Sequence, residues 1–518
     1  MIRASRRVRG QRVPLSAPRA RRHTSPAPIL GLNVRDALAN MREDEATILD
    51  NWFPEESSVR IRRGSASHAT GLGSTVESVM TYAGGASEKM FAAADGAVYE
   101  TTNSGAVGAA EFSSMLNNRW QHDNFGNSAG NFLYIVNGFD APRYYDGSSW
   151  TVPTITGSGL TASNLIYVNA FKRRLFFIEK NTLSFWYFPV ETIAGAITRF
   201  RLDPLSKLGG YLMAMGNWTV DGGDGIDDYA IFLTSKGEVF IFQGTDPGDA
   251  NNWAHVGTYR IGAPIGRRCL EKLGSEIIAV TEDGFVPMSQ FLPSGRAGGA
   301  KALSDRVSGA ISDAVRDRRT NFGWQPIVYP AGHMMLFNVP IRESIEAHQY
   351  VLNTNTGAWC RFKDWNANCF GIFGDNLYFG GNGTVYKADT GDSDDGADIS
   401  ATVRTSFSYL GNPGRNKTIM LARPLLSTDG NLTTAMGVDV DFASDTPTGT
   451  PTFTEAAGEN WNEAVWDEAA WGGKPEVKKD WQAVSGYGDA FALRFNTSTQ
   501  GEVKWSATNW LYEPGALL

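Results

Sequence analysis

The sequence predicts an all-β protein whose largest part is a β-propeller. From about residue 76 onward, short apolar runs alternate with glycine-containing turns, as in MFAAADGAVYET, AIFLTSKGEVFIFQ and LYFGGNGTVYKAD. Each unit has the pattern strand, tight turn, strand, and Asp-Gly and Asn-Gly corners are typical of β-hairpins. The 57 glycines and the aromatic content of 12% agree with many short strands joined by turns.

Residues 1–30 are predicted to be a basic arm ahead of the folded chain. Residues 1–35 contain no acid and nine arginines, namely Arg3, Arg6, Arg7, Arg9, Arg12, Arg19, Arg21, Arg22 and Arg35. Without these nine, 38 basic residues face 55 acidic ones, and the formal net charge changes from −8 to −17. A basic arm on an acidic body indicates docking on nucleic acid or on an acidic partner, and a solvated terminus is the alternative. No apolar stretch follows the arginines, so a secretory signal is not indicated.

Residues 31–75 are expected to form a short helical segment and then a strand. Ala37, Leu38 and Met41 have helical spacing. Pro54 disfavours helix at the residue before it, so we expect the helical run to end there.

The strand that is expected after Pro54 alternates apolar residues with arginines. In SVRIRRG, Val59 and Ile61 are expected to point to one side and Arg60 and Arg62 to the other. This pattern predicts a buried apolar side and an open face that carries cations.

Residues 76–390 have room for six or seven blades at about 40–50 residues per four-stranded blade. A long β-sandwich is the competing architecture. One helix is expected inside this region, because apolar residues recur four apart at Leu303, Val307, Ile311 and Val315. We expect it to pack on a face of the propeller as an insertion.

A polar, acidic linker, TGDSDDGADIS, marks a domain boundary near residue 390. Beyond it, ATVRTSFSYL and MGVDVDF alternate with period two. Residues 391–518 are therefore predicted to be a second all-β domain with a sandwich-like fold.

No catalytic motif, cofactor site or metal motif is found. The sequence lacks HExxH, a P-loop, GxSxG and CxxC. Its three cysteines, Cys269, Cys360 and Cys369, indicate neither a disulfide framework nor a zinc site, and they fit a reducing compartment. No apolar run approaches the ~18 residues of a membrane span. We therefore expect a soluble protein that is not an enzyme.

Three other clusters are candidates for binding. Asp221, Asp224, Asp227 and Asp228 lie in a glycine-rich loop, for which an acidic surface loop is favoured over a calcium site. Trp461, Trp466 and Trp471 recur every five residues among acids, which favours packing at a domain edge or subunit interface over stacking on sugars or bases. Lys172, Arg173 and Arg174 precede an apolar strand and are either a solvated hairpin end or a contact that faces a ring.

The block from residue 28 to residue 64 contains a pattern of spaced residues, namely Pro28, Gly31, Leu32, Asn33, Met41, Asn51, Trp52, Phe53, Pro54, Arg62 and Gly64. This pattern resembles the N-terminal signature of the tail nozzle proteins of short-tailed bacteriophages. These podovirus proteins are also called tail tubular protein B-like, and they are similar to packaged-DNA stabilisation proteins. Further blocks agree, including LYIVNGFDAPRYYDGSSW, FKRRLFFIEKNTLSFWYFPVETIAG and SFSYLGNPGRNK. The resemblance spans most of residues 28–420.

The resemblance implies a structural virion protein at the distal end of the phage tail. Such subunits form a homohexameric ring below the portal and adaptor, near the tail fibres or spikes. The ring retains the packaged double-stranded DNA until infection and then forms the channel for its ejection. Localisation would be the virion, with assembly in the host cytoplasm. An acidic channel lining would repel phosphates and let the DNA slide.

On this interpretation the segment around NWFP is an assembly joint. Its candidate residues are Asn51, Trp52, Phe53, Pro54, Arg60 and Arg62, where a subunit would meet its neighbour or the adaptor. The alternative for Trp52 and Phe53 is that they fill the core of their own chain. The alternatives for the whole protein are a glycan-binding or glycan-degrading propeller, acting as a receptor-binding protein or depolymerase, and a cellular propeller scaffold.

Overall fold

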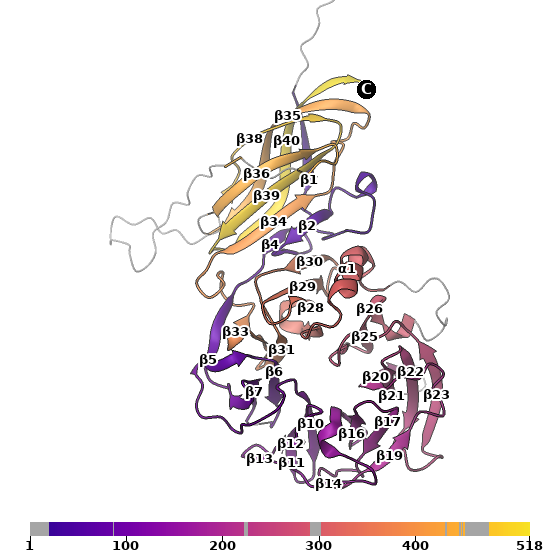
Figure 1. The fold of residues 1–518 in the computed structure, drawn as a ribbon. Coiled ribbons are helices and arrows are strands. Elements are labelled where there is room, and N and C mark those ends of the chain that lie inside the picture. Colours follow the sequence, from indigo (N-terminus) through magenta and orange to yellow (C-terminus); the bar gives the residue numbers. More distant parts are fainter. Residues whose placement is uncertain are drawn as a thin grey trace, which may run out of the picture.

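The computed structural model describes residues 20–517, except residue 86 and residues 222–225, 291–301, 430–431, 445–446, 448 and 451–475. It shows a ring of small sheets with a second body of longer strands attached at one side (Figure 1). Several candidate residues lie outside the described residues, namely Arg3, Arg6, Arg7, Arg9, Arg12, Arg19, Asp224, Trp461, Trp466 and Trp471.

The ring is a β-propeller of seven blades, as far as the described residues show. Each blade is a small antiparallel sheet built from strands that follow one another in the sequence. The first three blades are β6 (Ser78–Tyr82), β7 (Lys89–Ala94) and β8 (Ala97–Glu100); β10 (Gln121–Asn127), β11 (Gly130–Val136), β12 (Arg143–Tyr145) and β13 (Trp150–Thr151); and β15 (Leu165–Phe171), β16 (Arg174–Glu179), β17 (Ser184–Tyr187) and β19 (Thr198–Arg201). The next three are β20 (Leu212–Asp221), β21 (Ile226–Thr234), β22 (Glu238–Gly244) and β23 (Trp253–Arg260); β24 (Leu270–Leu273), β25 (Glu276–Thr281) and β26 (Gly284–Pro287); and β27 (Gln325–Tyr329), β28 (Met334–Arg342), β29 (Glu346–Asn353) and β30 (Trp359–Phe362).

The seventh blade closes the ring with a strand from the N-terminal part of the chain. It contains β31 (Cys369–Phe373), β32 (Asn376–Gly380) and β33 (Asn382–Ala388), and β5 (Ser65–Thr75) pairs antiparallel with β33. The innermost strands β6, β10, β15, β20, β24, β27 and β31 contact one another in sequence order around the axis, and β31 contacts β6. The propeller therefore includes β5, and the predicted start of the propeller at residue 76 was too late.

The blades are held by apolar side chains that interlock between neighbouring sheets. Between the third and fourth blades, the rings of Phe185 and Phe232 stack with centroids 4.3 Å apart. Between the first and second blades, Phe91 meets Tyr145 edge-to-face at 4.9 Å. Such pairs explain the high aromatic content, because each blade buries both of its faces against other blades.

The predicted helix forms α1 (Ser308–Arg318) and contacts β26 and β28. Ile311, Ala314 and Val315 are its buried residues, so the predicted stripe is confirmed at Ile311 and Val315. Leu303 and Val307 lie before the helix, which is therefore shorter than predicted. Short 3₁₀ turns lie at η1 (Leu38–Asn40), η2 (Ala162–Asn164), η3 (Met288–Gln290), η4 (Asp305–Val307) and η5 (Pro330–Gly332). Short additional strands are β9 (Gly105–Ala106), which pairs with β5, and β14 (Ile155–Thr156), which pairs with β18 (Gly195–Ala196).

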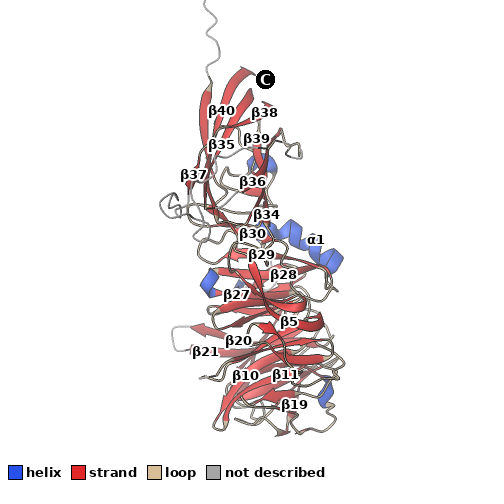
Figure 2. Cartoon of the chain, turned by 90° about the vertical axis from the view of Figure 1, so that its left-hand side faces the viewer, coloured by secondary structure: helices blue, strands red, loops and turns tan. Residues whose placement is uncertain are grey.

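The second body contains two packed sets of strands (Figure 2). One sheet comprises β1 (Arg21–Pro26), β3 (Trp52–Pro54), β4 (Val59–Ile61), β35 (Arg415–Thr428), β37 (Glu476–Lys478), β38 (Gln482–Gly488) and β40 (Val503–Leu517). The other comprises β2 (Ala46–Asp50), β34 (Ile399–Thr405), β36 (Leu432–Val440) and β39 (Phe491–Thr499). Phe495 of β39 and Trp505 of β40 meet between them, with ring centroids 5.0 Å apart.

The two bodies share one continuous sheet of eight strands. Strand β2 pairs parallel with β30 of the sixth blade, at Asp50 and Arg361, and antiparallel with β34 of the second body. The expected helical segment before Pro54 is therefore wrong, because only η1 is helical there and Ala46–Asp50 is a strand. Pairing on both sides of β2 outweighs the local helical spacing of the apolar residues.

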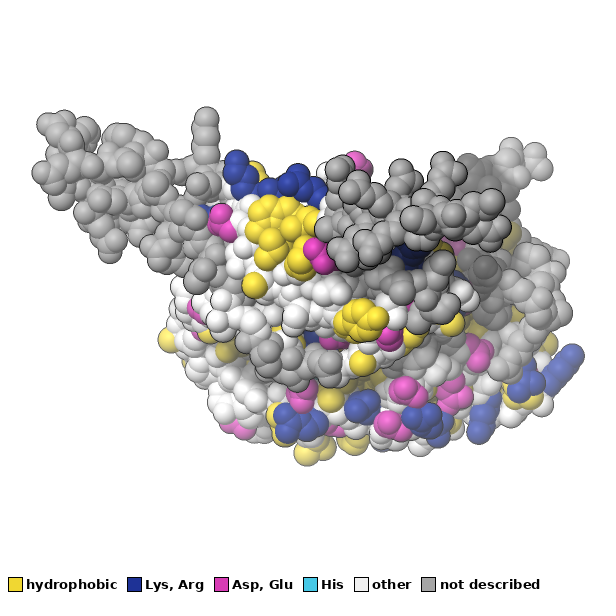
Figure 3. Space-filling view, turned by 90° about the horizontal axis from the view of Figure 1, so that it is seen from above, with side chains coloured by type: hydrophobic (Ala, Val, Ile, Leu, Met, Phe, Trp, Pro, Cys, Tyr) yellow, Lys and Arg dark blue, Asp and Glu magenta, His cyan; other side chains and the backbone are white. Residues whose placement is uncertain are grey.

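The surface of the described residues mixes charges of both signs. Seen from the end that the second body occupies, basic and acidic side chains are interspersed and a few hydrophobic side chains are exposed (Figure 3). No helix in the described ranges is long and apolar enough to cross a membrane.

Candidate functional site

The block from residue 28 to residue 64 folds into a buried joint between the propeller and the second body. All eleven residues that carry the sequence resemblance are buried. Two of them are glycines because the chain passes too close for a side chain. A Cβ on Gly31, whose φ is +82°, would lie 2.3 Å from the carbonyl oxygen of Trp359, and one on Gly64 would lie 1.8 Å from that of Ser393.

Asn51 is the centre of this joint. It is fully buried with φ +60°, a conformation that asparagine tolerates better than most residues. Its Oδ1 accepts hydrogen bonds from Arg62 Nε at 3.0 Å and from the backbone N–H of Lys363 at 2.8 Å. Its Nδ2 donates to the carbonyl oxygen of Ser400 at 2.8 Å. One side chain thus ties together the N-terminal segment, the end of the sixth blade and the start of the second body.

Arg62 lies inside the chain and not on an open face, so this part of the sequence prediction was wrong. Its side chain is 1% exposed and donates to both carboxylate oxygens of Asp394, at 2.9 and 2.5 Å. Nη2 also donates to the carbonyl oxygen of Lys363, and the guanidinium lies 4.9 Å from the ring centroid of Trp365. A buried arginine is tolerated because a carboxylate, carbonyl groups and an aromatic face surround it.

The other predicted joint residues also make contacts within the chain. Trp52 is fully buried and packs edge-on against Phe495, with centroids 5.5 Å apart. Phe53 lies under Arg60, whose guanidinium is 5.0 Å from the ring centroid and pairs with Glu55 at 3.0 Å. The buried Pro54 accepts a hydrogen bond from the Asn353 amide. Trp52 and Phe53 therefore fill the core of their own chain, as the alternative interpretation proposed.

Several basic residues from the sequence analysis also have partners within the chain. Lys172 pairs with Asp228, Arg173 pairs with Glu191, and Arg174 pairs with Asp246 at 2.9 Å. Arg21 and Arg22 lie exposed on β1, an edge strand that pairs with β40. Arg35 pairs with Asp36 and Asp305.

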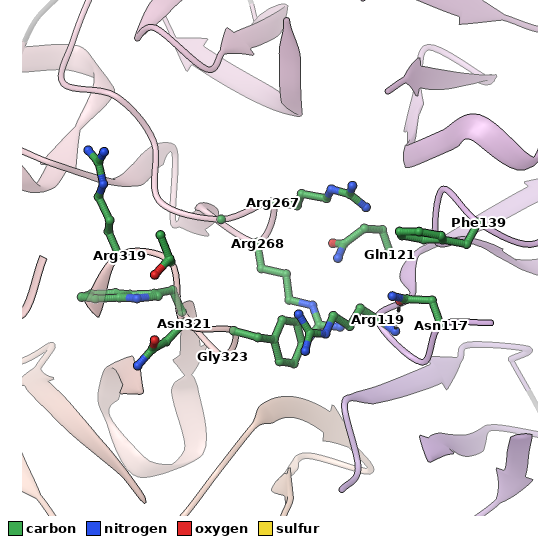
Figure 4. A pocket seen from close by; sticks show the side chains of 13 residues that line it. Asn117, Arg119, Gln121, Phe139, Arg267, Arg268, Arg319, Asn321 and Gly323 are labelled. Carbon is green, nitrogen blue, oxygen red and sulfur yellow. Dashed lines mark hydrogen bonds between the residues drawn. The ribbon is translucent and has the colours of Figure 1, made fainter. Parts of the chain in front are cut away.

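An arginine-lined pocket of about 350 Å³ covers one end of the propeller axis. Its residues come from opposite parts of the propeller (Figure 4). The second blade and its loops contribute Asn117, Arg119, Gln121 and Phe139. The segments before the inner strands of the fifth and sixth blades contribute Arg267, Arg268 and residues 319–324. The pocket lies where these inner strands begin.

Arg268 reaches across the axis of the propeller. It precedes β24 of the fifth blade, and its Nη2 donates to the carbonyl oxygens of Glu77 and Trp120 and to Ser78 Oγ, at 2.8–3.0 Å. These acceptors lie at the starts of the first and second blades. The side chain therefore closes the axis on the side of the pocket.

Below Arg268 the inner strands carry carboxyl groups that are unusually weak acids. Burial raises the pKa of Asp123 to about 6, although the backbone N–H groups of Ala170 and Asn124 donate to its carboxylate. Burial likewise raises the pKa of Glu271 to about 7 and that of Tyr167 well above its usual value. Raised carboxyl pKa values occur at many active sites, but here both carboxyl groups are engaged by backbone N–H groups of neighbouring strands.

Nothing in the described residues forms a metal site. No group of three or more His, Cys, Asp or Glu side chains there is arranged to hold an ion. Asp228 of the predicted acidic loop is engaged by Lys172 and Thr219. Cys269, Cys360 and Cys369 are free and buried, and burial raises the pKa of each thiol.

The arginine-lined pocket was not predicted from the sequence. Its residues lie in four separate segments, and no motif joins them. The pair Arg267–Arg268 after GAPIG was the available signal, but only the closed ring brings it opposite Arg119 and Gln121.

Comparisons with known proteins leave the function open. No family model and no curated protein matches this sequence. Similar solved structures include BBS1N in complex with ARL6DN, with a TM-score of 0.39, 10% identity, and coverage of 63% of this chain and 97% of that chain. The β-propeller domain of Myceliophteria thermophila Cps50 (Swd1) has a TM-score of 0.36, 10% identity, and coverage of 67% and 99%. A putative 6-phosphogluconolactonase from Bacteroides fragilis has a TM-score of 0.35, 14% identity, and coverage of 64% and 91%. The propeller fold alone does not decide whether the chain is an enzyme.

Proposed function

We propose that this chain is a structural subunit of the tail nozzle of a short-tailed phage, without enzymatic activity of its own. The proposal rests on the resemblance of the block from residue 28 to residue 64 to the nozzle signature, and the eleven matching residues are all buried in one segment of the fold. They form one joint that ties a propeller to a second β body through Asn51, Arg62 and the shared sheet. This joint fixes the propeller and the second body to each other, as a subunit of a ring under mechanical load would need.

The DNA path in such a ring would lie between subunits and not inside the propeller. Arg268 crosses the propeller axis and donates to the first and second blades on the far side. A double helix has no passage there. The exit channel would instead run along the symmetry axis of a closed cyclic assembly, proposed to be a homohexamer that contacts the adaptor, the portal and the tail fibres or spikes.

The acidic character of the body suits this channel. With 55 acidic residues against 47 basic ones, nine of which lie in residues 1–35, the body carries a net negative charge. A negative lining lowers the affinity for phosphates, so DNA is held by closure of the channel and slides once it opens.

Quantitative mass spectrometry of purified phage particles tests the proposal. The chain should be present at about six copies per particle, as the proposed homohexameric ring requires, and at about half the copy number of the portal. Absence from particles would reject the virion assignment. Incubation of the purified chain with host capsule or oligosaccharide tests the glycan-degrading alternative, for which we expect no release of sugar.

A further inference from the structure

The pocket at the end of the propeller axis holds positive charge that the described residues do not neutralise. Arg119 is paired with Glu77 and Glu343, and Arg319 with Glu282. Arg267 and Arg268 are adjacent and partly buried, yet no carboxylate in the described part of the chain forms an ion pair with either. Charges that are withdrawn from water are normally paired. The Glu77 carboxylate attracts Arg268, whereas Arg267 has no carboxylate partner among the described residues.

The two arginines are held in place before any ligand arrives. Arg268 is anchored through Nη2 by three acceptors at 2.8–3.0 Å. Arg267 donates through Nη1 to the carbonyl oxygen of Asn137 at 3.1 Å, and Asn137 is itself fully buried. Within the described residues, Nε and Nη2 of Arg267 have no hydrogen-bond acceptor, and Figure 4 shows this side chain directed toward Gln121 and Phe139. Donors fixed in this way bind an oxyanion without a large loss of side-chain entropy.

The walls of the pocket are aromatic. The ring centroid of Phe322 is 4.1 Å from the guanidinium group of Arg119 and 5.2 Å from that of Arg268. Phe139 is 48% exposed at the edge of the pocket, with Lys180 Nζ 4.8 Å from its ring centroid. A volume of about 350 Å³ with apolar walls and a few fixed polar groups is typical of a small-molecule site.

We propose that this pocket binds a small organic anion, whose carboxylate or phosphate group pairs with Arg267 and Arg268 and whose apolar part lies against Phe139. The oxyanion supplies the missing counterion, and the guanidinium forks match its oxygen atoms. The inference does not depend on the role of the chain in a virion.

The test uses the purified full-length chain and three probes of similar size. Isothermal titration calorimetry at constant ionic strength compares benzoate, phenyl phosphate and the neutral benzyl alcohol. At least one anion should bind, and benzyl alcohol should bind at least about tenfold more weakly, as expected when a charge-assisted hydrogen bond is lost. The ratio of the two anion affinities decides between carboxylate and phosphate.

Matched variants locate the binding. Arg267→Gln should weaken anion binding about tenfold or more, in line with the loss of a charged hydrogen bond. Arg42→Gln is the control, because Arg42 is 67% exposed and pairs with Asp44 outside the pocket. This variant should bind the anions as tightly as the wild type does. Arg268→Gln should also weaken anion binding, and its circular dichroism spectrum and melting temperature show whether the variant is folded. The proposal is overturned if neither anion binds more tightly than benzyl alcohol, or if Arg267→Gln binds as tightly as Arg42→Gln.

Discussion

Arg62 and Asp394 form a two-pronged ion pair inside the chain, with Nη1–Oδ1 and Nη2–Oδ2 distances of 2.9 and 2.5 Å, although 332 residues separate them. Arg62 follows β4 of the second body, and Asp394 lies in the linker that leaves the seventh blade. The chain passes between the two bodies from β4 to β5 and again from β33 to β34. The ion pair therefore holds these two connections together. This finding makes the acidic linker a structural element in addition to a boundary.

Replacing Arg62 should unfold the joint before it affects the blades. Arg62→Met leaves Asp394 partly buried without its cation, and breaking a buried ion pair in this way costs about 3–5 kcal/mol. Arg342→Met is the control, since Arg342 is 64% exposed and its pair with Glu346 should contribute only about 0–1 kcal/mol. Urea denaturation followed by tryptophan fluorescence measures both. Equal losses in the two variants would contradict a locking role for Arg62.

Asn51 should tolerate glycine better than alanine. Both substitutions remove the hydrogen bonds to Arg62, Lys363 and Ser400. Alanine must in addition adopt φ +60°, which costs an L-residue about 1–2 kcal/mol more than glycine. We therefore expect Asn51→Ala to have a lower free energy of unfolding than Asn51→Gly by about that amount. Identical unfolding curves would show that the backbone relaxes away from the left-handed region.

Glu271 should make the propeller less stable as the pH rises. Burial raises its pKa in the folded chain to about 7, above the usual value of about 4.3 for an unfolded glutamate. Between these values the folded state binds more protons than the unfolded state, so stability falls with rising pH across this window.

Glu271→Gln isolates this contribution. The amide cannot ionise, so the difference in unfolding free energy, variant minus wild type, should increase from pH 5 to pH 8 by about 1–3 kcal/mol. Asp375→Asn, at an exposed side chain, is the control for exchanging a carboxylate for an amide. A difference for Glu271→Gln that does not change with pH would show that its carboxyl is not buried in the folded chain.

The hairpins of the propeller could be predicted from the sequence, but the joint and the pocket could not. Alternating apolar residues and glycine turns are local signals, and Val59 and Ile61 are buried as their spacing predicted. Arg60 and Arg62 occupy equivalent positions in the alternating pattern of SVRIRRG. Arg62 is nevertheless buried, because it pairs with the distant Asp394. Strand β2 lies in the segment that was expected to be helical from the spacing of Ala37, Leu38 and Met41. Its pairing partners β30 and β34 come some 300 residues later or more, so no local pattern reveals them. Long-range partners thus determined the elements that local patterns predicted wrongly.

The role of the basic arm is best tested by two truncations. Residues 21–26 form β1, which pairs with β40, and Ser25 Oγ accepts a hydrogen bond from Trp510 Nε1 at 3.2 Å. Removing residues 1–27 therefore removes an edge strand together with the arm and should lower the melting temperature. Removing residues 1–19 eliminates Arg3, Arg6, Arg7, Arg9, Arg12 and Arg19 and leaves β1 in place, so the melting temperature should stay unchanged.

The shorter truncation then separates docking from folding. If the arm binds DNA or an acidic tail partner, the chain without residues 1–19 should enter phage particles less efficiently than the full chain, and the defect should be reproduced by a full-length chain with these six arginines changed to glutamine. Charge attraction to an acidic partner also weakens with salt, so binding of the full chain to tail complexes should decrease between low and physiological ionic strength. Equal incorporation of the truncated and full chains would refute an arm-mediated contact.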